Sequence, residues 1–225
     1  MKFFDDKSKN IKWWNRNYFY IGTIVIVIIN ILLFKLLGSS WENSIVDIDG
    51  MNHWDDMVYL NPTIASFFNS FSHANWQHVL LNMLCFAVCG FYLERKTGSL
   101  GMVGLVLFGA YVSSVAITGN DLSVAWHGFS GVNYFLYAYV ILDFLFSFAK
   151  TKRNKTNIII GAILIVLIYV AMCFSGGVSG FEFKLYPYDL LHNCGHYCGF
   201  LMGFAIGLFK NIIELSAKHS AKQNI

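Results

Sequence analysis

Charged side chains are scarce in this sequence. Only 13% of the 225 residues are Asp, Glu, Lys or Arg, whereas 56% are hydrophobic. A soluble domain would carry roughly a quarter charged residues. The composition therefore argues against a water-soluble enzyme or binding module, and it predicts a protein surrounded by lipid.

The sequence also lacks a small-residue cleavage site after its first hydrophobic run, and it lacks internal repeats and low-complexity tracts. The missing cleavage site, together with the length of the run, predicts a retained signal anchor and not a removable signal peptide. The missing repeats argue against a small-solute transporter, whose fold is commonly duplicated, and they predict one domain. The five cysteines all lie in or beside hydrophobic runs, which argues against a disulfide framework.

Six hydrophobic runs are long enough to cross about 30 Å of hydrocarbon at 1.5 Å per residue. They cover residues 18–37, 78–93, 100–118, 130–148, 157–174 and 195–209. The sequence thus predicts an all-α polytopic membrane protein with six transmembrane helices and a long outer loop between the first two. We expect a membrane domain at residues 18–210, a cytoplasmic segment at 1–17 and a cytoplasmic tail at 211–225.

The basic residues are distributed unevenly between the two sides of these runs. Fourteen of the sixteen Lys and Arg lie before the first run, after the second, between the fourth and fifth, or after the sixth. The other three connections hold eight of the thirteen acidic residues. By the positive-inside rule, both termini are cytoplasmic. Because topology explains the net charge of +3, the expected partner is the lipid bilayer and no nucleic acid is expected.

The pattern Gly-x-Ser-Gly occurs twice, around Ser130 and around Ser179. Ser130 opens the fourth run, where a serine is also an ordinary helix cap. Ser179 is followed by two charges and Pro187, so it belongs to an outer loop. The motif alone does not separate a capping serine from a nucleophile, and the residues around it must decide.

Four polar side chains fall at one depth of the membrane. His78 and Asn82 lie four residues apart on one helical face of the second run, Ser130 opens the fourth, and His196 lies at the start of the sixth. All three runs cross from outside to inside. Counting back from their inner ends places the four side chains about 18–27 Å above the inner boundary. Polar groups at this depth are costly and indicate a functional site.

The four groups have the chemistry of a serine hydrolase. A serine needs a base to become a nucleophile, and His196 could accept its proton and pass it to a leaving amine. His78, Asn82 and the backbone N–H of Ser130 could donate hydrogen bonds to the oxyanion. Glycines from Gly199 to Gly207 recur every four residues, and they predict a flat helix face that allows His196 to approach Ser130.

A metal site is an alternative for residues 192–198. His192 and His196 could share a helical face, and two cysteines between and after them could supply thiolates. The chain has no His-Glu-x-x-His, however, and the nearest carboxylate, Asp189, lies in the preceding loop. We therefore expect no metal and no other cofactor.

These residues together resemble the motifs of the rhomboid intramembrane serine proteases. The family carries H-x-x-x-N on the second span, G-x-S-G at the start of the fourth and H-x-x-G-x-x-x-G on the sixth. The matching residues are His78 and Asn82, then Gly128, Ser130 and Gly131, then His196, Gly199 and Gly203. The segments 71–78 and 94–99 resemble the family's entry to and exit from the second span, so the resemblance covers about residues 71–207.

The resemblance implies a serine endopeptidase with a two-residue catalytic centre. Ser130 would be the nucleophile and His196 the general base and acid, with oxyanion donors from His78, Asn82 and Ser130. The positions expected to support them are Tyr134, Gly128, Gly131, Asn193 and Gly199. A dyad needs no third acidic residue, so neither Asp121 nor Asp189 is required. Asp143, low on the fourth span, is expected to form hydrogen bonds on the cytoplasmic side.

The resemblance also implies single-pass transmembrane proteins as substrates, cut near the outer end of their membrane helix. They would enter between the second and fifth spans, beneath a loop at residues 175–193. A bacterial cell membrane is the expected location. The alternative is a rhomboid-like protein that binds membrane clients without cutting them, although such proteins typically lack the serine or the histidine. One departure from many bacterial members is that residues 38–77 contain no Lys or Arg, and hence no Trp-Arg pair.

Overall fold

The computed structural model describes residues 20–37, 67–68, 70–73, 75–118, 128–150, 163 and 194–223. Its four long elements are all helices: α2 (Ile21–Leu37), α6 (Trp76–Thr118), α7 (Ser130–Lys150) and α10 (Cys194–Gln223). The all-α prediction is confirmed for this part of the chain. The predicted fifth span, apart from residue 163, lies outside the described residues, as do the loops at 38–66 and 175–193.

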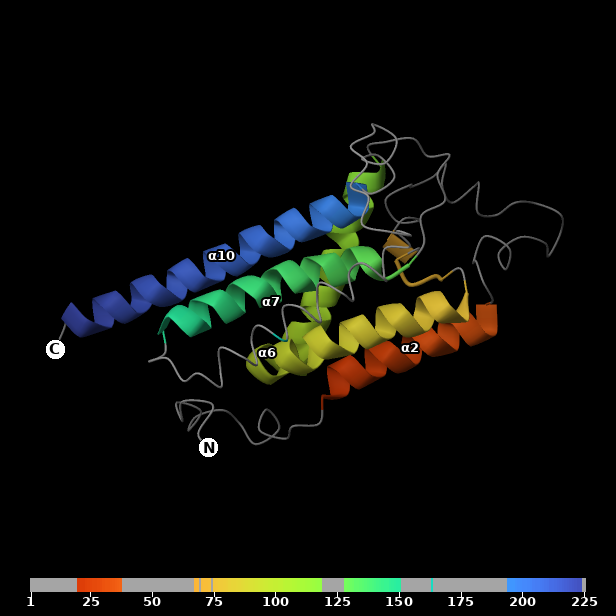
Figure 1. The fold of residues 1–225 in the computed structure, drawn as a ribbon, viewed down its shortest axis with the longest axis horizontal. Helices are drawn as coiled ribbons and strands as arrows, with labels where there is room; N and C mark the ends of the chain where they lie inside the picture. Colours follow the sequence, from red (N-terminus) through yellow and green to blue (C-terminus); the bar gives the residue numbers. More distant parts are fainter. Residues whose placement is uncertain are drawn as a thin grey trace.

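α6 contains two of the predicted spans joined by a sharp turn. The helix runs from Trp76 to Thr118, but Gly98 has a φ of 76° and a ψ of 166°, which is not helical. Glycine adopts a positive φ without the steric cost that an L side chain meets there. The two arms of α6 therefore leave Gly98 in different directions (Figure 1), and they correspond to the predicted spans at 78–93 and 100–118.

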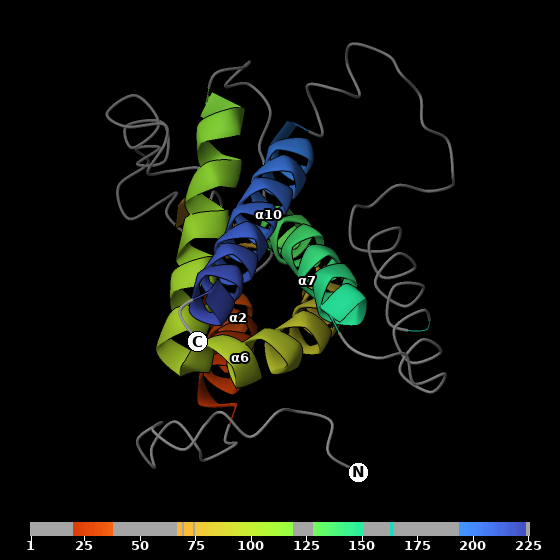
Figure 2. The same cartoon turned by 90° about the vertical axis from the view of Figure 1, so that its left-hand side faces the viewer.

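In Figure 1 the first arm of α6, α7 and α10 run in one direction, and α2 runs in the opposite direction. α7 packs against both α6 and α10, and α2 packs against α6. The starts of α6, α7 and α10 lie at one end of the bundle, at the right of Figure 1. The start of α2, the Gly98 turn and the later parts of α7 and α10 lie toward the other end, and Figure 2 views the bundle from that side. The three predicted site segments are thus brought to the same end.

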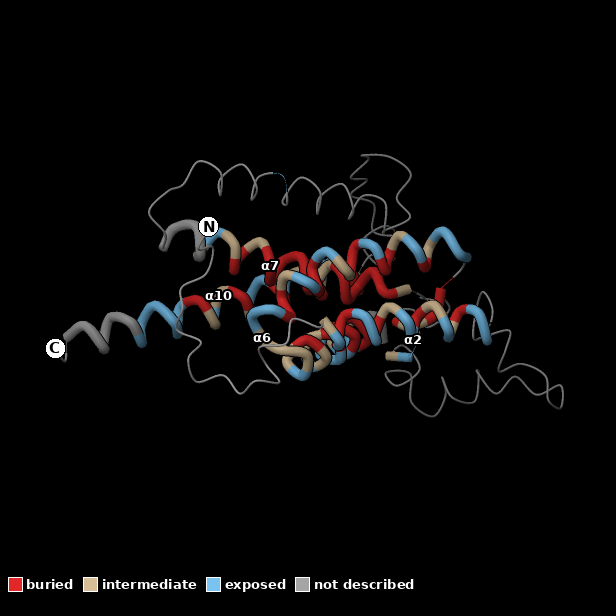
Figure 3. The backbone as a smooth tube through the Cα atoms, turned by 90° about the horizontal axis from the view of Figure 1, so that it is seen from below, coloured by how far each residue is buried: buried red, intermediate tan, exposed pale blue. Residues whose placement is uncertain are grey.

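α7 forms the centre of the described bundle. Most of its residues are buried, as the red tube in Figure 3 shows, whereas α2 and the later part of α10 are exposed along one side. Apart from Lys35 near its end, the exposed side chains of α2 from Ile21 to Leu36 are large and apolar. A continuous apolar surface of this kind is disfavoured in water and natural in hydrocarbon.

Length and composition fit a membrane for two of the four long helices. Two helices, Trp76–Ala116 and Cys194–Ala217, are long and apolar enough to cross one, and Ile21–Leu36 and Ser130–Phe146 are shorter apolar helices. α10 continues to Gln223, beyond the predicted end of the sixth span at residue 209. The prediction followed hydrophobicity, which falls after residue 209, but the polar residues that follow include good helix formers.

Glycines bring α10 into backbone contact with α7, as the four-residue repeat predicts. A Cβ on Gly203 would lie 2.0 Å from the carbonyl oxygen of Phe135, and one on Gly199 would lie 2.5 Å from that of Gly131. Neither position has room for any side chain. Because both glycines lie on the face that carries His196, this packing controls how closely His196 approaches α7.

Two carboxylates connect the helices at the end away from Ser130. Glu94 accepts hydrogen bonds from the backbone N–H groups of Gly22 (2.7 Å) and Thr23 (2.8 Å) and from the Thr23 hydroxyl (2.6 Å). It therefore caps the first turn of α2, where an anion is favoured. This contact joins α2 to the end of the first arm of α6.

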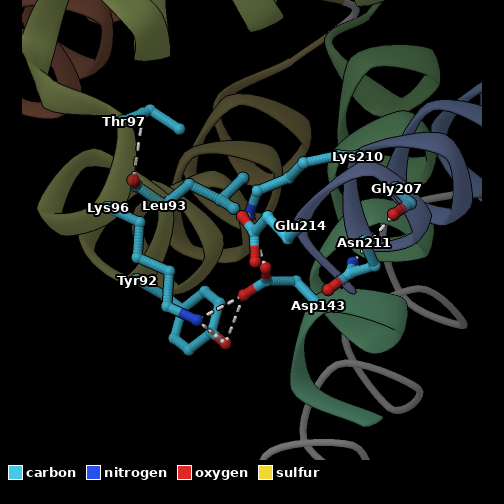
Figure 4. Close-up of polar contacts among 9 residues, drawn as sticks. All are labelled: Tyr92, Leu93, Lys96, Thr97, Asp143, Gly207, Lys210, Asn211 and Glu214. Carbon is cyan, nitrogen blue, oxygen red and sulfur yellow. Dashed lines mark hydrogen bonds and ion pairs between the residues drawn. The ribbon is translucent and has the colours of Figure 1, made fainter. Parts of the chain in front are cut away.

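Asp143 of α7 connects that helix to α6 and to α10 (Figure 4). Its carboxylate forms ion pairs with Lys96 of α6 and with Lys210 of α10, the latter at 2.6 Å, and it accepts a hydrogen bond from the Tyr92 hydroxyl at 2.8 Å. Glu214 lies 3.5 Å from the ammonium group of Lys210. The predicted hydrogen-bonding role of Asp143 is confirmed, and both of its carboxylate oxygens have a cationic partner.

Candidate active site

The side chains of Ser130 and His196 are in direct contact. Ser130 is the first residue of α7, and His196 is the third residue of α10. The Ser130 Oγ lies 2.6 Å from the His196 Nε2, and both residues are buried. A serine hydroxyl hydrogen-bonded to an imidazole nitrogen is the arrangement in which histidine can act as base for a serine nucleophile.

Tyr134 holds the imidazole in this position. It lies one helical turn after Ser130, so it projects from the same side of α7. Its ring stacks on the His196 ring with centroids 4.6 Å apart and an interplanar angle of 20°. Stacking fixes the plane of the imidazole and leaves its edge directed at the Ser130 hydroxyl.

The turn before Ser130 lies against the His78 ring. Gly128 has a φ of 119°, and a Cβ there would lie 2.6 Å from His78 Cε1 and 2.8 Å from His78 Nε2. Only glycine satisfies both the backbone angle and the close approach. The same Cβ position lies 3.6 Å from Asn82 Nδ2. His78 and Asn82 therefore meet the segment that leads into Ser130.

The amide of Asn82 is buried and only half satisfied. Its Oδ1 accepts a hydrogen bond from Asn133 Nδ2 at 3.0 Å. Its Nδ2 has no hydrogen-bond partner among the residues that the structure describes. An unpaired buried donor is costly, and donors held ready for a developing negative charge are the basis of an oxyanion hole. The backbone N–H of Ser130 is a second donor, because the first N–H groups of a helix have no partner within it.

A family model for the rhomboid domain matches residues 63–211, which is more than half of the chain. The chain belongs to the rhomboid family. This confirms the resemblance drawn from the three motifs, and it makes the chain an integral membrane protein of an intramembrane protease family that also has inactive members. A search of curated proteins found no significant match.

The start of α6 in this rhomboid is built to hold His78. The Asn75 side chain accepts a hydrogen bond from the His78 backbone N–H at 2.8 Å, as an N-cap residue does. The ring of His73, which is buried, packs edge-to-face against the His78 ring with centroids 5.2 Å apart. The segment that leads into the second span therefore orients one of the expected oxyanion donors.

The structure places most of the residues that the sequence singled out. It brings together Ser130, His196, Tyr134, His78, Asn82 and Gly128, with Gly131 and Gly199 at the adjacent helix crossing. Asn193, Ser179, Asp121, Asp189 and His192 lie outside the described residues. Within the described part of the rhomboid, no three His, Cys, Asp or Glu side chains are grouped closely enough to hold a metal ion.

One residue of this site is missing from the sequence interpretation. Asn133 is fully buried and donates to Asn82, but the motifs do not include it. The rule that singles out Asn82, a polar side chain inside a hydrophobic run at the depth of Ser130, applies equally to Asn133. That signal was sufficient to find it.

Proposed function

We propose that this rhomboid is an intramembrane serine endopeptidase that cuts single-pass membrane-anchored proteins near the outer end of their transmembrane segment. The observation that carries the proposal is the 2.6 Å contact between the Ser130 Oγ and the His196 Nε2 in a buried setting. Family membership supplies the reaction class, and the contact supplies the pair of groups that the reaction needs.

The first half of the reaction follows from this geometry. His196 Nε2 accepts the Ser130 hydroxyl proton as Oγ attacks the carbonyl carbon of the scissile bond. The negative charge that forms on the carbonyl oxygen accepts hydrogen bonds from Asn82 Nδ2, the His78 side chain and the Ser130 backbone N–H. The positive end of the α7 dipole favours the same charge.

The second half uses the same groups in reverse. Protonated His196 donates its proton to the leaving amine, and the first product leaves with Ser130 acylated. A water molecule, deprotonated by His196, then attacks the acyl carbonyl; the bond to Ser130 Oγ breaks, His196 returns the proton to Oγ, and the second product leaves as the acid. No cofactor takes part in this sequence.

The rival function is a rhomboid-like protein that binds membrane clients without cutting them. Such a protein needs neither a nucleophile nor a base. The direct contact of Ser130 with His196 and the stacking of Tyr134 on that histidine favour the protease. We further propose a bacterial cell membrane with both termini cytoplasmic, and the bilayer and membrane-anchored substrates as its partners.

The proposal is tested with purified protein in liposomes that contain a set of transmembrane substrates. Residues that act as a unit are not additive when removed. Ser130→Ala, His196→Ala and the double variant should therefore lose cleavage to the same extent, and Ser179→Ala should keep it. A serine-directed fluorophosphonate should label the wild type at Ser130. Cleavage that survives in Ser130→Ala, or labelling at Ser179, would contradict the proposal.

A further inference from the structure

Asn133 is a buried polar residue of α7 with no part in the reaction as proposed above. It lies three residues after Ser130 and is fully buried. Its Nδ2 donates to two oxygens of Asn82 on α6, the backbone carbonyl at 3.1 Å and the side-chain Oδ1 at 3.0 Å. A single side chain of α7 thus contacts both the main chain and the side chain of an expected oxyanion donor.

The chemistry of the amides fixes how both side chains are oriented. A backbone carbonyl can only accept, so the end of Asn133 that faces the Asn82 carbonyl must be its NH₂ group. The second N–H of that group then requires an acceptor, so Asn82 must present Oδ1 to it. Turning either amide over would place two donors or two acceptors together.

This arrangement decides where the donor of Asn82 points. With Oδ1 held by Asn133, Nδ2 lies on the other side of the amide, 3.6 Å from the position of a Cβ on Gly128. Nδ2 has no hydrogen-bond partner among the described residues. It therefore faces the turn that leads into Ser130, where the oxyanion forms in the proposed reaction.

We propose that Asn133 is a positioning residue that holds the Asn82 amide with its donor toward the oxyanion. The inference rests on the proposed function and deepens it. Without Asn133 the amide can turn about its terminal torsion, which is soft, and present Oδ1 to the developing negative charge. Oxyanion donors are effective because they are oriented before the reaction begins, and in this rhomboid Asn133 supplies that orientation.

Two substitutions distinguish a role of Asn133 in positioning the Asn82 amide from a role in merely holding α6 to α7 by a hydrogen bond. Asn133→Leu keeps the branched outline of asparagine, is larger and has no donor. Asn133→Asp is nearly the same shape, and burial favours its neutral acid form. That acid can donate its O–H to the Asn82 carbonyl and accept from Nδ2, so it keeps two bonds between α6 and α7 while turning the Asn82 donor away from Ser130.

The experiment measures kcat, KM and the melting temperature of the full chain in liposomes with a transmembrane substrate. Removing an oxyanion donor lowers kcat by about 10²–10³, and we expect both variants to lose at least about tenfold in kcat with KM unchanged. Asn133→Asp should melt near the wild-type temperature. In an Asn82→Ala background, Asn133→Leu should have no further effect on kcat, because the group that it positions is already gone.

The matched control is Asn30→Leu. Asn30 is also a fully buried asparagine, but it donates to the Ile26 carbonyl of its own helix on α2. This control should keep the wild-type kcat whatever it does to the melting temperature. The inference is overturned if Asn133→Asp keeps the wild-type kcat. It is also overturned if the fold-loss of kcat in the double variant equals the product of the losses in Asn133→Leu and Asn82→Ala. A wild type that neither cleaves nor reacts with a fluorophosphonate overturns the proposed function, and the inference falls with it.

Discussion

At the scale of single residues, the site depends on the absence of a side chain at Gly128. The backbone there adopts a φ of 119°, which L side chains rarely adopt, and the His78 ring fills the space where a Cβ would be. This one residue therefore sets the direction in which the chain enters α7 and lets the turn before Ser130 lie against the His78 ring. Ser130 is the first residue of α7, so the turn at Gly128 determines where it lies.

Gly128→Ala should strongly reduce activity in an otherwise folded protein. The added methyl group would have to displace the His78 ring, and the backbone would have to leave its positive φ. A misplacement of about 1 Å costs roughly 10²-fold in rate, so we expect kcat/KM to fall by at least about that factor. The measurement is substrate cleavage together with the helical circular dichroism signal.

Gly104→Ala is the control for this substitution. Gly104 lies in the second arm of α6, and a Cβ there would have no neighbour within 4 Å. Its variant should cleave like the wild type, since alanine favours a helix more than glycine does. Wild-type cleavage by Gly128→Ala would mean that the turn before Ser130 does not position the nucleophile.

Much of the site follows from the sequence because depth and helical periodicity are properties of single helices. These two rules place His78, Asn82, Ser130 and His196 together before any contact is known. They do not give the 2.6 Å contact of the dyad or the orientation of the Asn82 amide, because those depend on how two helices pack. The role of Asn133 is of this second kind, since its partner is on another helix.

At the scale of helices, the α7–α10 crossing brings the two halves of the dyad together. Gly199 and Gly203 lie three and seven residues after His196, on a face that contacts the backbone of α7. Lipid tails are as apolar as the side chains, so no hydrophobic driving force brings the helices together, and close packing is one of the main sources of helix association. The same contacts that hold α10 on α7 therefore hold His196 on Ser130.

Gly203→Ala should destabilise the protein and reduce activity together. Its Cβ would lie 2.0 Å from the Phe135 carbonyl oxygen, so α10 has to move away from α7. Overpacking of this kind costs about 1–3 kcal/mol, and the displacement carries His196 from Ser130. Thermal melting and cleavage assays measure both effects.

A larger side chain on the other side of α10 provides the comparison. Ala205 is exposed, so Ala205→Leu adds more volume than Gly203→Ala but places it in lipid. This variant should melt and cleave like the wild type. If Gly203→Ala does the same, the close contact between α7 and α10 is not what positions His196.

The helices themselves were largely predictable, and the exceptions have a common cause. Hydrophobic length located the described spans, and the charges around Glu94 separated the two arms of α6 before Gly98. Hydrophobicity indicates where the lipid ends and not where a helix ends, so it does not predict the extension of α10 to Gln223. Hydrophobicity also says nothing of partners, so the two lysines that bind Asp143 could not be chosen in advance.

At the scale of the whole molecule, the two ends of the bundle carry different chemistry. One end holds Ser130 and His196 with uncharged polar partners. The other holds the Asp143 network with its two lysines (Figure 4), partly exposed where they can reach polar headgroups. Lysines and arginines are retained on the cytoplasmic side of membrane proteins. The dyad end should therefore face outward, and in the proposed reaction this orientation would decide which end of a substrate helix is cut.

Labelling of single cysteines tests that orientation on one helix. In a variant whose five cysteines are replaced, Gln77→Cys lies near the start of α6, and Leu100→Cys lies just after the Gly98 turn; both positions are exposed. A membrane-impermeant maleimide added to intact cells should label position 77 at once and position 100 only after the membrane is opened. Both positions sit on α6, so differences in expression or folding affect them alike. The reverse pattern would place Ser130 toward the cytoplasm, and substrates would then be cut at the inner end of their membrane helix.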